Sequence, residues 1–78
     1  MKEFKGIVKE VFIPNEYKNN QLIDIMYATK IGFKIKLDND EEITIIKEQD
    51  EYNANILKDD EVTIIQEVVD GNYTYDLY

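Results

Sequence analysis

The sequence predicts an all-β domain with minor helix, built as a small five-stranded barrel. Two observations lead to this class: apolar residues recur at every second position in several short segments, and turn-forming residues separate these segments. A chain of 78 residues can build one core, and it is too short to divide. We therefore expect a single small β-barrel domain over residues 1–78.

The first strand is predicted over Phe4–Phe12, where apolar and polar residues alternate until Lys9 and Glu10 interrupt the period. Two polar residues in succession indicate a β-bulge, which bends a strand so that it can serve two parts of a barrel. Gly6 suits this curved segment because it has no side chain to crowd the bend. Pro14 then ends the strand.

A hairpin is predicted in the middle of the chain. Over Ile31–Leu37 every second residue is apolar, so one face of this strand belongs to the core and the other to solvent. The acidic segment 38–41 supplies turn residues, and the alternation resumes over Glu42–Lys47.

Two segments are less regular. Tyr52–Lys58 is too short for an independent helix, but it can form one or two turns if Ile56 and Leu57 pack on the barrel. The segment Asn15–Lys30 fits a strand and a helical face almost equally well. We favour a strand, preceded by an exposed loop over residues 15–20.

The last two strands are predicted over Glu61–Val69 and Tyr73–Leu77. Asp70 and Gly71 between them form a strong hairpin signal, because a tight two-residue turn needs the positive φ that glycine adopts freely. Five strands, a bent first strand and a helical turn between the third and fourth strands favour an OB-like barrel. The alternative is an SH3-like barrel with residues 15–30 as its long first loop.

The order of several short motifs resembles that of cold-shock domains over most of the chain. These motifs are Gly6-Ile7-Val8-Lys9, Phe12, Gly32-Phe33, Leu57 and Val62-Thr63-Ile64. The resemblance implies a small barrel that binds single strands through exposed aromatic rings set among basic residues. Here the outward positions of the second and third strands are Gly32, Lys34, Lys36, Thr44 and Ile46. Because none of these is a ring on which a base can stack, the resemblance extends to architecture only.

The composition argues against catalysis. The chain has no His, Cys, Ser or Arg, the residues that supply most general bases, nucleophiles, soft-metal ligands and phosphate clamps. Asp38, Asp40 and Glu42 have the spacing of calcium ligands, but Ile43 stands where such a loop needs glycine. We therefore expect no enzyme activity, no catalytic residue, no cofactor and no metal.

Charge and hydropathy limit the range of partners. Nine Lys against seventeen Asp and Glu give a net charge of −8, which favours solubility and repels a phosphate backbone. No apolar run approaches the roughly 20 residues of a membrane-spanning helix, and no export signal is visible. We expect a soluble cytoplasmic protein that binds neither membranes nor, as a rule, nucleic acid. Its enrichment in Ile, Lys and Asn suggests a bacterial or phage source.

Apolar residues remain on the outward faces of the predicted strands. The candidate partner-binding residues are Ile7, Ile46, Ile65, Val69 and Tyr78. At about 25 cal/mol per Å2, leaving such side chains in water forgoes a few kcal/mol. We expect the segment Leu22–Tyr27 to fold over this face, with a second copy or a protein partner as the alternative cover. The leading expectation is a non-catalytic interaction module that binds a protein partner or forms a homo-oligomer.

Two other functions follow from the charges. Four lysines project from neighbouring strands and could form a stripe for nucleic acid, although solvated lysines paired with carboxylates are the ordinary case. These are Lys5, Lys9, Lys34 and Lys36. The acidic segments 38–42, 48–51 and 59–61 could instead imitate phosphates, as in an acidic inhibitor or DNA mimic of phage or mobile-element type.

Overall fold

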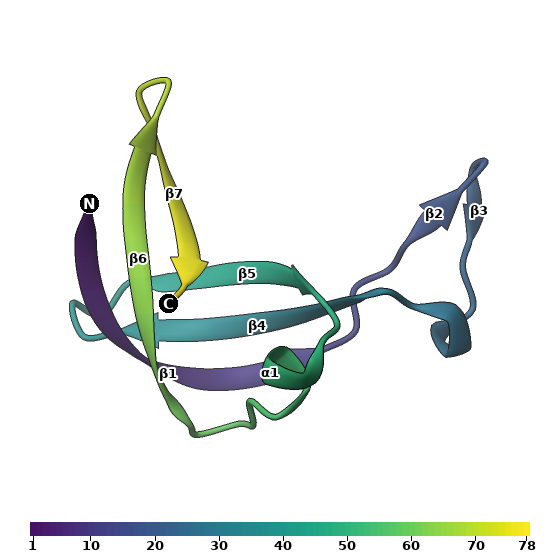
Figure 1. Cartoon of the computed structure of the whole chain (residues 1–78), viewed down its shortest axis with the longest axis horizontal. Helices are drawn as coiled ribbons and strands as arrows, with labels where there is room; N and C mark the ends of the chain where they lie inside the picture. Colours follow the sequence, from purple (N-terminus) through teal and green to yellow (C-terminus); the bar gives the residue numbers. More distant parts are fainter.

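The computed structural model describes residues 1–78 as a curved sheet with one projecting hairpin (Figure 1). In chain order the elements are β1 (Lys2–Phe12), β2 (Tyr17–Lys18), β3 (Gln21–Leu22), the 3₁₀ turn η1 (Ile25–Tyr27), β4 (Lys30–Leu37), β5 (Glu42–Glu48), α1 (Glu51–Ala54), β6 (Glu61–Val69) and β7 (Asn72–Leu77). Five strands form one antiparallel sheet in the order β5-β4-β1-β6-β7, curled into a nearly closed barrel, while β2 and β3 pair separately. The predicted five-stranded barrel with little helix is confirmed. Neither helical segment has the length or apolar character needed to cross a membrane.

Strand β1 is paired along both edges, with β6 over its first half and with β4 over its second half. The pairing register with β4 shifts between Val8 and Glu10, so Lys9 is an extra residue and the predicted β-bulge is confirmed. Gly6 lies where the two pairings overlap. A Cβ atom there would lie 2.6 Å from Ile35 Cγ2, so the absence of a side chain lets β4 approach β1 closely.

The core is built from inward residues of four strands. Its buried members are Val8, Ile31, Phe33, Ile35, Leu37, Ile45 and Ile64. Strand β4 supplies four of them, and its intervening Lys34 and Lys36 are exposed, which confirms the predicted alternation, whereas Gly32 on the same outer face is buried against Phe12. Because only 10 of the 78 residues are buried, the fold has little apolar burial to spare.

An ion pair bridges the remaining gap in the barrel, between β5 and β7. Lys47 Nζ lies 2.7 Å from Asp76 Oδ1, and this hydrogen bond, with one from the Leu77 N–H, lowers the pKa of Asp76. Both side chains are partly exposed, so the pair contributes at most about 1 kcal/mol.

Helix α1 occupies the predicted place between β5 and β6. The Asp50 carboxylate accepts a hydrogen bond from the Asn53 N–H, and the buried Asn53 amide donates to the Glu48 carbonyl, which docks the turn on β5. Ile56 packs against the core as predicted, but Leu57 is 64% exposed, contrary to prediction. The helix ends at Ala54, so Ile56 and Leu57 share no helical face.

The hairpin turn between β6 and β7 also follows prediction. Asp70 has φ 52° and Gly71 has φ 79°, so both central residues adopt the positive φ of a type I′ turn.

Phe12 and Gly32 provide a test of the packing outside the barrel. A Cβ atom at residue 32 would lie 2.4 Å from Phe12 Cζ, so Gly32→Ala must displace the ring. We expect Gly32→Ala to lower the free energy of unfolding by about 1 kcal/mol. In a Phe12→Ala background the same change is expected to cost much less, which urea unfolding of the four proteins measures as a double-mutant cycle. Equal costs in both backgrounds would mean that the ring is not the obstacle.

Candidate functional site

Residues 13–29, here called the arm, leave the barrel and project away from it with β2, β3 and η1 (Figure 1). The expectation that Leu22–Tyr27 covers the barrel is therefore wrong. The exposed fractions in this segment are 59% for Leu22, 70% for Ile25, 81% for Met26 and 71% for Tyr27. The predicted long strand is also absent, since β2 and β3 have two residues each.

A tight turn explains why the arm folds back on itself. Asn19 and Asn20 have φ 53° and 64°, the positive values of a type I′ hairpin turn, which asparagine tolerates better than most residues. The Asn-Asn pair is the signal in the sequence that indicates this hairpin. Its two strands have two residues each, and the backbone hydrogen bonds of the apolar residues in η1 stay within the arm.

The base of the arm is held by the Glu16 carboxylate. Its Oε1 accepts hydrogen bonds from the N–H groups of Thr29 (2.7 Å) and Lys30 (2.8 Å), and its Oε2 accepts one from Thr29 Oγ1 (2.8 Å). The Thr29 hydroxyl is the main cause of a lowered pKa of Glu16, and the two N–H groups and the Lys30 charge add to it. One carboxylate thus joins the segment that leaves the barrel, residues 13–16, to the segment that returns to it, residues 23–29. These two segments are called the legs of the arm.

The 3₁₀ turn η1 presents three apolar residues in succession. Asp24 begins the turn, where its carboxylate accepts a hydrogen bond from the Met26 N–H at 2.9 Å. A 3₁₀ helix has three residues per turn, so the side chains of Ile25, Met26 and Tyr27 point in three different directions. The turn therefore exposes apolar side chains on three sides, and the Tyr27 hydroxyl is its only polar side-chain group.

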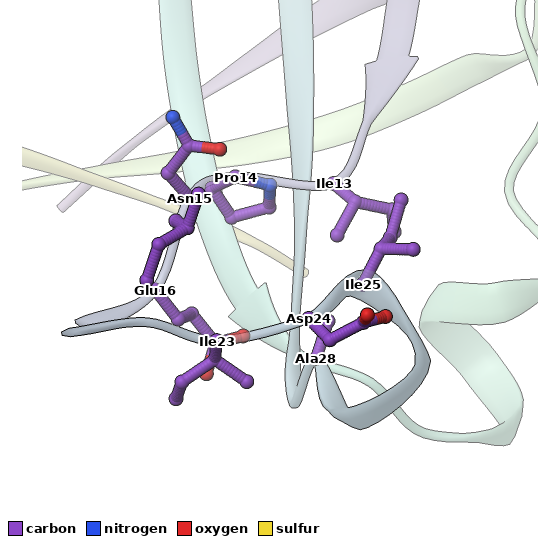
Figure 2. A pocket seen from close by; sticks show the side chains of 9 residues that line it. Ile13, Pro14, Asn15, Glu16, Ile23, Asp24, Ile25 and Ala28 are labelled. Carbon is purple, nitrogen blue, oxygen red and sulfur yellow. The ribbon is translucent and has the colours of Figure 1, made fainter. Parts of the chain in front are cut away.

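A hollow of about 420 Å3 lies between the two legs of the arm (Figure 2). Its apolar lining consists of Ile13, Pro14, Leu22, Ile23, Ile25 and Ala28. In the view of Figure 2, Ile13 and Ile25 lie on one side of the hollow, with Glu16 and Ile23 on the other. This lining offers contact to an apolar side chain, and its polar groups are Asn15, Glu16 and Asp24.

The residues predicted to bind a partner lie outside the barrel, but they are spread along it. Ile46 is 46% exposed and lies across β4 from Phe12. Ile7 lies five residues before Phe12 on β1, which is about 16 Å along the strand at 3.3 Å per residue. Ile7 and Ile46 are therefore well separated on the outer face. Ile7 is half-buried between its cross-strand neighbours Lys36 and Glu61.

The other three predicted residues lie toward the opposite end of the sheet. Ile65 is half-buried between Glu3 and Asp76, Val69 is 49% exposed at the end of β6, and Tyr78 is 88% exposed at the end of the chain. Because charged residues flank Ile7 and Ile65 across the strands and the other three lie at separate places on the sheet, the five do not form one apolar patch. The larger exposed apolar surface is the arm, which the strand pattern did not indicate.

The four lysines of the expected stripe do lie near one another on the outside of the barrel. Lys5, Lys9 and Lys36 line one hollow, and Lys9 and Lys34 line a second. Carboxylates line both hollows as well, and two of the lysines are paired: Lys34 with Glu10 at 3.1 Å and Lys36 with Asp40 at 3.9 Å. Much of the positive charge is thus balanced within the chain.

Comparison with known proteins adds no relative. No protein-family model matches the chain, and neither a curated protein nor a solved structure matches it.

The base of the arm is expected to be sensitive to acid. The folded pKa of Glu16 lies below its ordinary value of 4.5, so the hydrogen bonds stabilise the arm above pH 4.5 and are lost as the pH falls through the folded value. In NMR titrations the Glu16 carboxyl carbon and the N–H groups of Thr29 and Lys30 should shift together, with a midpoint below 4.5. Glu16→Gln should abolish this transition at both N–H groups, whereas the control Glu51→Gln should leave it unchanged. Flat N–H shifts while the carboxyl titrates would contradict the assignment.

Proposed function

We propose that the chain is a non-catalytic protein-interaction module and that the arm is its binding element. One observation carries the proposal: six large apolar side chains of the arm are exposed to solvent. They are Ile13 (36%), Tyr17 (65%), Leu22 (59%), Ile25 (70%), Met26 (81%) and Tyr27 (71%). So many large exposed apolar side chains in one short segment are unusual in soluble proteins, and such exposure marks interaction sites.

The weakness of an isolated hairpin supports the same proposal. A two-stranded hairpin alone is marginally stable in water, and β2 and β3 together have four residues. Tyr17 and Leu22 are cross-strand neighbours, yet both stay more than half exposed. A partner that covers them adds the apolar burial that the barrel does not supply.

The distribution of charge favours a protein over a membrane or a nucleic acid as the partner. Helices that lie on anionic membranes carry several Lys or Arg beside their apolar residues, but Lys18 is the single lysine of the arm. The lysines that could contact phosphates lie on the barrel, and two of them already pair with carboxylates.

Photocrosslinking in the source organism tests the proposal. A photoreactive phenylalanine derivative at Tyr27 is expected to give a discrete protein adduct, because this side chain is exposed on the arm. The matched control is the same derivative at Tyr73, which is 67% exposed against 71% for Tyr27 but lies on β7. Equal labelling from both positions, or no protein adduct from Tyr27, would contradict the proposal.

The lysines supply the test of nucleic-acid binding. Because their charge is largely balanced, we expect the native protein and a Lys34→Glu/Lys36→Glu variant to show equally negligible affinity for single-stranded DNA and RNA at low salt. Fluorescence anisotropy measures this. Salt-sensitive binding by the native protein that the variant loses would favour the nucleic-acid alternative instead.

A further inference from the structure

The arm carries a projecting side chain and a hollow side by side. Met26 is 81% exposed at the middle of η1, and the hollow between the two legs begins at the preceding Ile25. Methionine is unbranched and flexible, so it adapts to an irregular apolar recess. In a two-fold contact, a projection that fills a recess of the other copy has its own recess filled in the same way. The arm carries both parts of such a contact, a projecting side chain and a recess.

The charge of the molecule favours contact through the arm over contact through the barrel. The arm contains one lysine, Lys18, and two carboxylates, Glu16 and Asp24, so nearly all of the net charge of −8 belongs to the barrel. Two barrels therefore repel one another at short range. Because the arm projects from one side of the barrel (Figure 1), two copies can join arms while their acidic barrels point apart.

The exposed apolar area of the arm limits the size of the contact. At about 200 Å2 for a large side chain, the six apolar residues together expose at most roughly 800 Å2 on each copy. A standard protein–protein interface buries about 800 Å2 per partner, and the side chains of η1 point in different directions, so the pair falls at or below that size, among the weaker interfaces.

We infer that the occupant of the arm is a second copy of this chain. The two arms pack about a two-fold axis, and Met26 of each copy enters the hollow bounded by Ile13, Leu22 and Ile25 of the other. This inference rests on the proposed function and names the partner at the same site. A foreign protein on the arm is the competing outcome.

Sedimentation equilibrium between about 1 μM and 1 mM tests the dimer. The native protein is expected to reach twice its mass of 9.2 kDa. Met26→Asp buries an unpaired carboxylate at the contact and should weaken the dimer at least about tenfold. The matched control Val68→Asp, at a position 66% exposed on β6, should leave it unchanged. Both positions are exposed in the single chain, so both variants should keep the native far-UV circular dichroism.

The salt dependence separates the two kinds of partner. Screening reduces the repulsion between the acidic barrels, so the dimer should tighten as NaCl rises, whereas a basic foreign protein would bind the arm less tightly. A dimer that weakens steadily with salt would overturn the proposed arrangement.

A cysteine trap tests the geometry directly, because the chain has no cysteine of its own. A disulfide needs Cα atoms within about 7 Å, so Ile13→Cys and Met26→Cys proteins mixed under mild oxidation should link to each other. Val68→Cys mixed with Met26→Cys is the control and should link far less. Equal yields from both mixtures would overturn the arrangement.

The tests separate this inference from the proposed function. A monomer up to about 1 mM together with an adduct from Tyr27 to a different protein would overturn the dimer and leave the interaction module standing. A monomer with no adduct from Tyr27 would overturn both.

Discussion

The fold depends on one strand that pairs on both sides. Strand β1 contacts β6 with its first half and β4 with its second half, and the bulge at Lys9 together with the bare backbone of Gly6 lets it bend between them. Every other pairing in the barrel attaches through these two: β5 joins β4, and β7 joins β6. Few residues are buried, so the folded state also depends on this continuous network of backbone hydrogen bonds.

The elements that the sequence predicted correctly share one property: their signals are local. The alternation of β4 over Ile31–Leu37, the bulge at Lys9 and the Asp70-Gly71 turn each depend on neighbouring residues and on the period of a strand. Side-chain period also placed Ile7, Ile46 and Ile65 outside the barrel. It could not show that these three lie far apart, because their separation depends on how the strands are staggered in register.

Local sequence signals did not predict the structure of the arm. Between Asn15 and Lys30 the apolar residues fit a strand and a helix alike, and the chain forms neither at length, because a turn at Asn19-Asn20 and a cap at Asp24 divide it. No local signal in the sequence indicates whether apolar side chains such as Met26 turn toward the barrel or away from it. The base of the arm is held by hydrogen bonds that Glu16 accepts from Thr29 and Lys30, and contacts between residues this far apart in sequence leave no local signal.

The hydrogen bonds of Glu16 at the base of the arm bear on which changes of sequence this fold can accept. These hydrogen bonds end at Thr29 and Lys30, where β4 begins, so the arm leaves and rejoins the barrel at the neighbouring ends of two paired strands, β1 and β4. A different hairpin, longer or differently decorated, could be inserted there without disturbing the strand order. With the arm as the proposed binding element, folding and recognition depend on separate segments of the chain, so the arm can vary in sequence while the strands of the barrel are retained.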